Sequence, residues 1–327
     1  MTSMKSSLKA SAALLAAALA FSSGAFCQAW PAKPVTLFVG SAAGSAPDVY
    51  ARTVAESLSR LLGQPVIVDN RAGANGNIAA ELVAKAPADG YALWAPAQSQ
   101  MEINPSAYAD LRWKLADFVG VIKGVEAPLV LVAHPGVPAK KLAELASWAK
   151  ANPGKVSYAS FSPGTASHFL GYQLNEQLGL DMTHVPFRGS GPQVQNLVGG
   201  HVPLGFSQVQ TTLPHIEGGR LVALATTGAT RWRQLPAMPT MAELGYPQLT
   251  ATTWFGLVAR AGTPPEILAK LVDAAKKVHS DPGVKKKLEN MGFDVPGEVD
   301  PAFSASIRAG AERWARIVRA TQFKAAE

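Results

Sequence analysis

The sequence predicts an α/β protein built of two lobes, and three observations support this fold class. Short runs rich in β-branched residues alternate with amphipathic stretches of about ten to fifteen residues, the pattern of crossover units with parallel strands. Of the 327 residues, 48% are hydrophobic and 16% are charged, which is enough for a well-filled core. The length also suits two domains of about 100 to 200 residues each.

Residues 1–29 predict a secretory signal peptide. Two lysines precede an apolar stretch over residues 10–21, and small residues follow as far as Ala29. The apolar stretch is too short to span a bilayer, which takes about 20 residues. Cleavage after Ala29 would remove Cys27, the only cysteine, so we expect an exported chain without disulfides. A lipid anchor on Cys27 is the alternative, which the bulky Phe26 before it disfavours.

The first lobe begins with three predicted strands joined by two helices. The expected elements are a strand at 35–39, a helix at 47–62, a strand at 66–68, a helix at 78–86 and a strand at 91–94. Pro47 fits the first turn of its helix, where no N–H is needed. Because each helix lies between two strands, the strands should be parallel.

A second series of the same kind follows a long β-branched run near 119–132. Its expected elements are helices at 140–151, 165–178 and 192–198, and strands at 156–158, 182–185, 204–206 and 221–225. A strand at 253–258 then leads into helices at 264–280, 282–291 and 301–320. We therefore expect lobe 1 at 30–130, lobe 2 at 131–253, a return segment to lobe 1 at 254–327, and a ligand cleft between the lobes.

Three strand-to-helix loops carry small and hydroxyl-bearing residues. In the first, residues 40–48, the free backbone amides of a helix start form a ready anion site. We expect Asp48 to cap the helix or to orient the loop amides rather than to catalyse a reaction. Residues 70–77 and 159–168 repeat the arrangement, and ligands of open α/β sheets bind at this edge. Any one of these loops is equally consistent with a tight packing turn, but together they favour a binding site.

The sequence contains no motif typical of a hydrolase, a metalloprotease, a nucleotide-binding protein or a nucleic-acid-binding protein. Gly-x-Ser-x-Gly and His-Glu-x-x-His are absent, and the six histidines are scattered singly. His168 follows Ser167 directly, so on a helix the two side chains would point about 100° apart. Residues 40–48 lack the lysine of a P-loop and the glycine spacing of a dinucleotide fingerprint. The net charge of +7 is dispersed, with residues 285–287 a solvated helix face. We expect no catalytic residue, metal, cofactor or nucleic-acid partner.

A series of short motifs runs in order along the chain after residue 29. The motifs are Trp30-Pro-Ala-Lys-Pro34, Ala42-Ala-Gly44 with Asp48-Val-Tyr-Ala-Arg52, Leu62-Gly-Gln-Pro-Val66, Asn70-Arg-Ala-Gly-Ala-Asn-Gly-Asn-Ile78, Ala88-Asp-Gly-Tyr91, Ile103-Asn-Pro105, Gly164-Thr-Ala-Ser-His168, His184-Val-Pro-Phe-Arg-Gly189, Pro236-Ala-Met-Pro-Thr240 and Trp254-Phe-Gly-Leu257. Together they resemble the Bug family of extracytoplasmic solute receptors, the binding subunits of tripartite tricarboxylate transporters.

The resemblance implies a monomeric periplasmic binding protein of the Venus flytrap type (type II), with two crossing strands as its hinge. It implies a small carboxylate ligand (a dicarboxylate, tricarboxylate, acidic amino acid or aromatic acid) delivered to membrane permease subunits. A receptor that feeds a sensor system and, less favoured, a periplasmic hydrolase are the alternatives. The ligand-binding residues that we expect are Ser41, Ala42, Ala43, Gly44, Ser45, Asp48, Ser99, Ser162, Gly164, Thr165, Ser167, Phe206 and Ser207.

The chain departs from the family pattern at three places. Gly40 and Ser41 stand where the family usually has Pro and a bulky residue, and Ser45 replaces the second glycine of a pair. Ser207 stands where an Asp is common. Such changes would remove a wall and an acid from the pocket, so we expect a larger or more anionic ligand.

Overall fold

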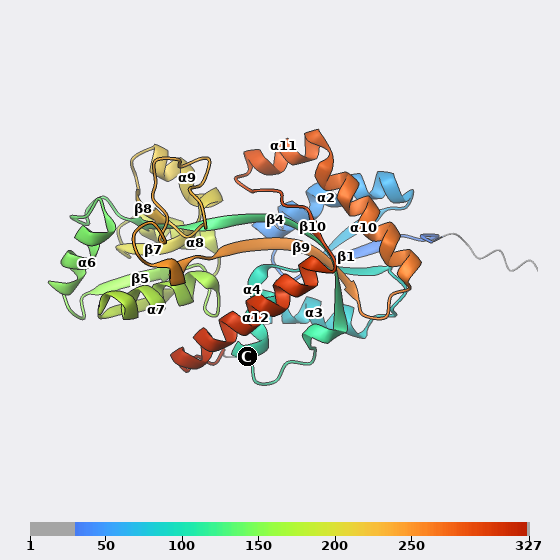
Figure 1. The fold of residues 1–327 in the computed structure, drawn as a ribbon, viewed down its shortest axis with the longest axis horizontal. Coiled ribbons are helices and arrows are strands. Elements are labelled where there is room, and N and C mark those ends of the chain that lie inside the picture. The colour runs from blue at the N-terminus through green and yellow to red at the C-terminus, as the bar shows by residue number, and fades with distance from the viewer. Residues whose placement is uncertain (1–29, 326–327) are drawn as a thin grey trace, which may run out of the picture.

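The computed structural model describes residues 30–325, which fold into two α/β lobes joined by long strands (Figure 1). The predicted signal peptide and Cys27 lie outside the described residues. One mixed sheet runs through both lobes in the order β2-β1-β3-β9-β4-β7-β5-β6, and β10 and β8 also pair with β4. Within residues 30–325, no helix combines the length and the apolar character that a membrane crossing requires.

Lobe 1 contains a small parallel sheet at its centre. Its elements are β1 (Val35–Val39), α2 (Ala46–Leu62), β2 (Val66–Asn70), η2 (Ala74–Gly76), α3 (Asn77–Lys85), β3 (Ala92–Ala95), α4 (Gln98–Glu102), α5 (Asn104–Ala107) and η3 (Leu115–Asp117). β1 pairs in parallel with both β2 and β3, as the crossover pattern predicts. The three expected strands and two expected helices are therefore present, with ends shifted by one or two residues.

Lobe 2 repeats this plan. Its elements are α6 (Leu142–Lys150), β5 (Val156–Ser160), α7 (Ala166–Leu178), β6 (Met182–Pro186), α8 (Ser190–Val198), β7 (Leu204–Gln208), α9 (Val209–Glu217), β8 (Val222–Thr226) and η4 (Pro247–Leu249). β5 pairs in parallel with β6 and β7. Helix α9 is missing from the sequence-based prediction because it contains Pro214 and starts with a β-branched residue, both of which disfavour helix.

Two long strands connect the lobes. β4 (Phe118–Ala133) and β9 (Thr252–Arg260) pair antiparallel from Phe118–Arg260 to Pro128–Thr252. Beyond this point β4 continues into lobe 2, where its last residues pair with β7 and β8. The two crossings predicted near 119–132 and 250–258 are therefore one hydrogen-bonded ribbon.

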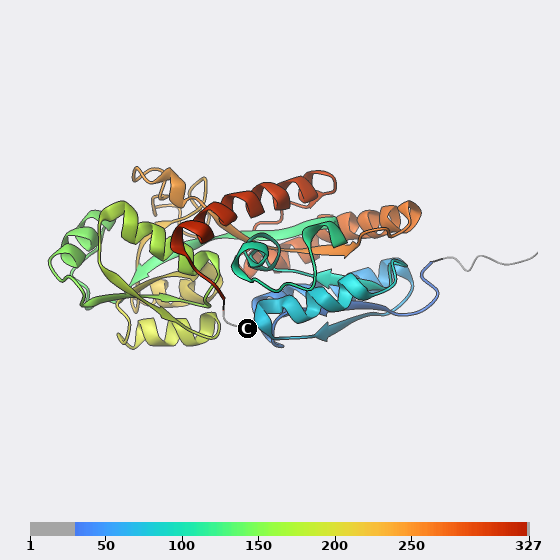
Figure 2. The ribbon, with the colours of Figure 1, turned by 90° about the horizontal axis from the view of Figure 1, so that it is seen from below.

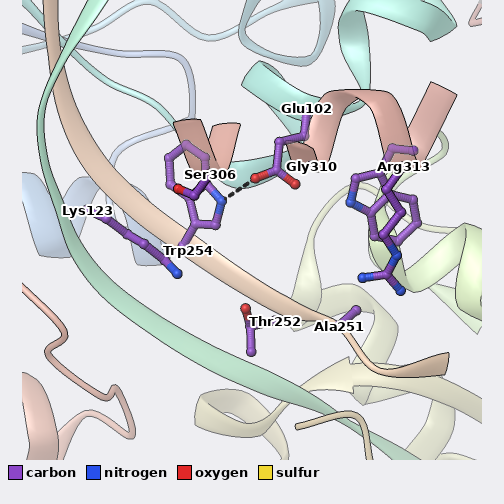
Figure 3. Close-up of a pocket in the computed structure, with 9 residues that line it drawn as sticks. Glu102, Lys123, Ala251, Thr252, Trp254, Ser306, Gly310 and Arg313 are labelled. Atoms are coloured by element: carbon purple, nitrogen blue, oxygen red, sulfur yellow. Dashed lines mark hydrogen bonds between the residues drawn. The ribbon is translucent and has the colours of Figure 1, made fainter. Parts of the chain in front are cut away.

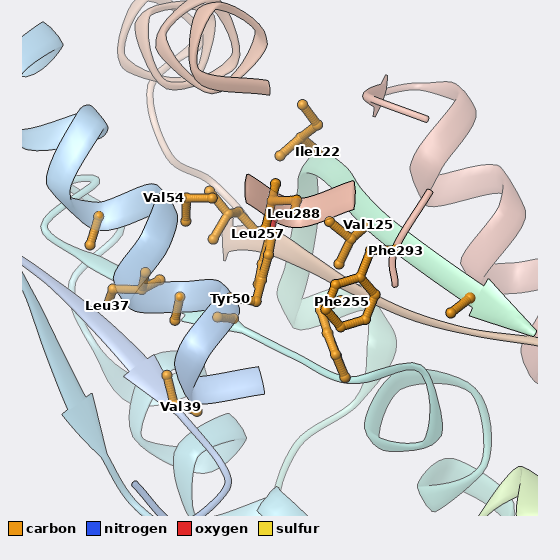
Figure 4. Packing of buried hydrophobic residues seen from close by; sticks show 14 of the residues in the cluster. Leu37, Val39, Tyr50, Val54, Ile122, Val125, Phe255, Leu257, Leu288 and Phe293 are labelled. Atoms are coloured by element: carbon orange, nitrogen blue, oxygen red, sulfur yellow. The ribbon is translucent and has the colours of Figure 1, made fainter. Parts of the chain in front are cut away.

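The core of lobe 1 forms against this ribbon. Leu37 and Val39 of β1 are fully buried against Tyr50 and Val54 of α2. Figure 4 shows these side chains beside the ribbon residues Ile122, Val125, Phe255 and Leu257, with Leu288 and Phe293 closing the cluster from the C-terminal part of the chain. The ribbon is therefore part of the core of lobe 1 and not a free linker.

The C-terminal segment contacts both lobes. It contains α10 (Pro265–Ser280), α11 (Pro282–Asn290), β10 (Glu298–Val299) and α12 (Ala302–Thr321). Phe303 of α12 packs in a lobe 1 cluster, whereas Trp314 packs with Phe169 and other lobe 2 residues. Beyond the helix, the Phe323 ring stands edge-on to His168, 5.1 Å between centroids. α12 thus runs along both lobes (Figure 2).

Glu102 lies where α4, β9 and α12 meet. It accepts hydrogen bonds from Trp254 Nε1 at 2.6 Å and from Gln98 Nε2 at 2.7 Å, and it is 7% exposed. A Cβ at position 310 of α12 would lie 2.3 Å from the Glu102 carboxyl carbon, so a larger residue there would displace the carboxylate. Glu102 lines a cavity of about 150 Å³ together with Lys123 and Arg313 (Figure 3).

Burial raises the pKa of Glu102 to about 7, although hydrogen bonds from Gln98 and Trp254 and the charge of Lys123 act in the opposite direction. Above neutral pH an ionised carboxylate, with no ion pair among residues 30–325, is therefore held beside the β4–β9 ribbon at a cost in stability. The folded state keeps a proton that the unfolded chain loses near pH 4.5.

We predict that the free energy of unfolding falls, through this group, as the pH rises from about 4.5 to 7. Glu102→Gln should flatten that slope, so its stability relative to the parent should rise by roughly 2 kcal/mol between pH 5 and pH 8. Urea unfolding at pH 5 and pH 8 measures the effect. Glu312→Gln, an exposed carboxyl on α12, is the control. An unchanged slope in Glu102→Gln would contradict the prediction.

Candidate ligand-binding cleft

A cleft of about 1270 Å³ lies between the lobes, at the carboxyl ends of the parallel strands. Its wall from lobe 1 consists of residues 41–47, 72–75, 97, 99, 100 and 255, and its wall from lobe 2 consists of residues 161–163, 165, 186–192, 208 and 211. Phe255 of β9 faces the cleft, while its neighbour Trp254 faces the cavity that Glu102 lines, because successive strand residues point to opposite faces.

Helix starts converge on the cleft. Residues at or next to the N-terminus of α2 and α4 line it from lobe 1, and those of α7, α8 and α9 line it from lobe 2. The first backbone amides of a helix have no intrahelical partner and carry its positive partial charge. Among the described lining residues none is acidic, and Arg188 alone is ionisable. The cleft therefore suits an anion.

The buried Asp48 carboxylate holds the first loop in place through hydrogen bonds. It is 2% exposed and does not line the cleft; its Oδ2 accepts from Gly44 N at 2.8 Å and its Oδ1 from Asn70 Nδ2 at 2.9 Å. The same Asn70 amide donates to Ser41 O at 3.0 Å. Arg52, one helical turn later, pairs with the Asp48 carboxylate at 3.0 Å. This agrees with the expectation that Asp48 orients the loop amides.

Burial on its own would raise the pKa of Asp48. The hydrogen bonds from Arg52, Gly44 and Asn70 outweigh burial, so the pKa lies below its usual range. The carboxylate therefore stays ionised, and the charge of Arg52 compensates it.

The second loop packs directly on the first. A Cβ at Gly40 would lie 2.6 Å from Gly76 Cα, so the two loops touch backbone to backbone. The Gln100 side chain fills the space beside both glycines and accepts from Ala97 N at 3.0 Å. The departure at Gly40 thus does not open the pocket, because neighbouring atoms occupy that space.

In the facing loop of lobe 2, residues 159–168, side-chain hydroxyls donate hydrogen bonds to backbone carbonyl oxygens. Thr165 Oγ1 donates to Ser162 O at 2.7 Å, and both residues line the cleft. Ser167 Oγ instead points into the lobe and donates to Phe206 O at 2.5 Å, an oxygen that Gln193 Nε2 also reaches at 2.9 Å. The hydroxyl of Ser167 is therefore used to hold α7 on the sheet.

The structure separates the predicted site residues into two groups. Those that line the cleft are Ser41, Ala42, Ala43, Gly44, Ser45, Ser99, Ser162 and Thr165. Those that do not are Asp48, Gly164, Ser167, Phe206 and Ser207. Phe206 and Ser207 are fully buried, and Gly164 packs against the Phe323 ring. Ser207 is therefore part of the core behind the cleft. Its presence in place of an Asp does not remove an acid from the cleft wall.

The sequence prediction missed the loop at 186–192 and the lining residues Asn75, Gln100, Gln208 and Thr211. The loop was detectable, because it follows the expected strand at 182–185 and leads into the expected helix at 192–198. It is thus a further strand-to-helix loop of the kind already noted.

One serine and one histidine do lie in contact. Ser160 Oγ and His184 Nε2 are 2.7 Å apart, and the His184 ring stacks on His168 at 3.9 Å between centroids. Burial lowers the pKa of His184 to about 4, and burial together with the nearby His184 lowers that of His168 to about 3, so both rings are neutral at neutral pH. Ser160 is fully buried and outside the cleft lining, so this pair has no access to a substrate there. Within residues 30–325, no cluster of three metal-ligating side chains occurs.

Comparisons with known proteins agree with this architecture. Protein BugT of Bordetella pertussis is 35% identical over 302 residues, which cover 90% of this chain and 91% of BugT. A Rhodopseudomonas palustris protein solved with adipate superposes with a TM-score of 0.82 at 31% identity, covering 90% of this chain and 99% of that one. MatC of the same organism, solved with malate, gives a TM-score of 0.77 at 30% identity over 88% of this chain and all of MatC.

The family model for the tripartite tricarboxylate transporter family receptor matches residues 50–323. This match and the relatives confirm the resemblance drawn from the motifs and the two-lobed binding-protein fold. They also place the chain among binding proteins and not among enzymes. The chain belongs to the TctC/Bug family of periplasmic solute receptors of tripartite tricarboxylate transporters.

Proposed function

We propose that this receptor binds a small carboxylate in the interlobe cleft and delivers it to the membrane permease subunits of a tripartite tricarboxylate transporter. The observation that carries the proposal is the convergence of helix starts on a cleft wall that has no acidic side chain among its described residues. A carboxylate accepts several hydrogen bonds at once, which matches a wall made of backbone amides and hydroxyls.

The first loop is the proposed anchor for one carboxylate. Residues 41–45 have small side chains, so a ligand can approach the loop backbone closely, including the amides of residues 41–43. The Ser45 hydroxyl makes no hydrogen bond to any described residue, and it lies at the start of α2. Ser162 and Thr165 face it from lobe 2, and Ser99 contributes a further hydroxyl. Asp48 acts as a positioning residue, since it holds the Gly44 amide in place.

The relatives support a ligand of this class. The Rhodopseudomonas palustris protein was solved with adipate, and MatC was solved with malate. Both ligands are dicarboxylates, and both proteins share about a third of their residues with this chain. The predicted signal peptide supports a periplasmic location, and membership of the receptor family supports a permease partner.

The size of the cleft supports closure around the ligand. Pockets for small ligands usually measure about 300 to 1000 Å³, so 1270 Å³ leaves space that a small carboxylate cannot fill. A ligand that touches both walls would favour a closed arrangement by its differential contacts. We infer that the β4–β9 ribbon is the hinge of this motion.

We predict that aliphatic dicarboxylates stabilise the protein against heat. A ligand at 100 times its Kd adds about 2.7 kcal/mol, which corresponds to a rise in Tm of roughly 5 °C. A thermal-shift screen of protein stripped of bound ligand, with malate, succinate and adipate, measures it. The corresponding diamides are the matched controls, because they keep the shape and lose the charge. Equal shifts with acids and amides, or none with any acid, would refute the proposal.

Asp48→Ala should weaken binding through the loop. Loss of the acceptor leaves the Gly44 amide without a partner and removes one of the two acceptors of Asn70 Nδ2, which costs about 1 to 3 kcal/mol of stability. We expect a Kd for the best acid in the screen that is about tenfold higher, measured by calorimetry on folded protein. Glu56→Ala breaks the exposed Glu56–Arg60 pair on the same helix and is the control. Unchanged affinity in Asp48→Ala would contradict the assigned role.

Closure should be visible by fluorescence energy transfer. A chain starting at residue 30 has no cysteine, so Leu61→Cys in lobe 1 and Lys150→Cys in lobe 2 provide two exposed labelling sites. Transfer efficiency should change on addition of the ligand. A pair within lobe 1, Leu61→Cys with Lys85→Cys, should not respond. A ligand that binds without changing the interlobe signal would show that the lobes do not move.

A further inference from the structure

We propose that Arg188 binds a second negative group of the ligand, so that the receptor selects dianions such as dicarboxylates over monocarboxylates. The proposal rests on the proposed function, because the first carboxylate is assigned to the amides of residues 41–43 and the Ser45 hydroxyl in the first loop. The two anchors lie on different lobes, since residues 41–45 line the cleft from lobe 1 and Arg188 lines it from lobe 2.

The charge of Arg188 has no partner within the part of the chain that the structure describes. The side chain is exposed, and none of the ion pairs within 4.0 Å among residues 30–325 includes it. The arginines nearest the lobe 1 loops differ, because Arg52 is paired with Asp48 and Arg71 with Asp69. Arg188 is therefore a free guanidinium in a wall that contains no described acid.

The backbone around Arg188 is held in place. Phe187 N donates to Ser160 O at 2.9 Å, and Gly189 N donates to Phe161 O at 2.7 Å. The chain turns at Gly189, where φ is 108°, and α8 begins at the next residue. These bonds attach the loop to the end of β5 on both sides of Arg188, so the side chain starts from a fixed point in the cleft wall.

A guanidinium is suited to a second carboxylate. Its planar donors bind a carboxylate through two parallel hydrogen bonds, which a neutral or apolar ligand end cannot accept in the same way. While the cleft is open, water solvates the charge at little cost. When the lobes close, water is excluded and the pair becomes stronger, so an acid with two charged ends gains most from closure.

The test compares acids of matched length with one or two charges. We would measure Kd for malate against 3-hydroxybutyrate and for adipate against hexanoate, in the parent protein, Arg188→Gln and Arg188→Lys. Arg188→Gln should weaken binding of the dicarboxylates by tenfold or more and change that of the monocarboxylates by less than about threefold. For the dicarboxylates, the Kd of Arg188→Lys should lie between those of the parent and Arg188→Gln. Lysine keeps the positive charge but cannot form the two parallel hydrogen bonds of a guanidinium.

Arg220→Gln is the matched control, because Arg220 is exposed on lobe 2 and does not line the cleft. It should leave every Kd unchanged. If the parent binds the dicarboxylates and Arg188→Gln keeps the same ratio between the paired acids, the role of Arg188 is refuted while the proposed function stands. An equal loss for both members of a pair also refutes it, since Arg188 would then hold the shared carboxylate. If the parent binds none of the four acids, the proposed function itself fails.

Discussion

The proposed ligand site depends on one constraint, the placement of helix starts with free backbone amides at the edges of the two sheets. In a parallel crossover, the first turn of each helix lies at the carboxyl edge of the sheet. Both lobes are built from such crossovers, and their edges face each other across the cleft. The other features follow from this arrangement: glycine at position 40 lets two loops pack together, and the buried Asp48 carboxylate holds the amides of one loop in place.

Direct packing connects the first cleft loop and α2 to the β4–β9 ribbon, the proposed hinge. A Cβ at Gly124 of β4 would lie 1.9 Å from Tyr50 Oη, so α2 approaches the strand as closely as a glycine permits. Tyr50 also contacts His279 of α10 through its hydroxyl at 3.1 Å. The helix whose start lines the cleft is thus packed against the strand that joins the lobes. On the other face of β9, Glu102 connects the strand to α12, which continues to lobe 2.

Much of the fold was predictable, because local composition determines it. β-branched runs mark the strands, and small residues mark the loops at 40–48 and 159–168. Features that depend on long-range contacts were not predictable. Phe206 and Ser207 lie at a strand end, yet both are fully buried, which the sequence does not reveal. The sequence did not identify Arg188 as a candidate binding residue. Its proposed role depends on the absence of described acids in the cleft wall around it, which only the structure reveals.

The composition of the cleft wall bears on how recognition responds to the acidity of the surroundings. None of the described lining residues is an acid or a histidine. Beneath the wall, Asp48 holds its charge because its pKa is lowered, and His168 and His184 stay neutral above about pH 4. As the pH falls, binding would then fail when the carboxylates of the solute become protonated. The pKa values of the solute would therefore set the pH range in which the receptor works.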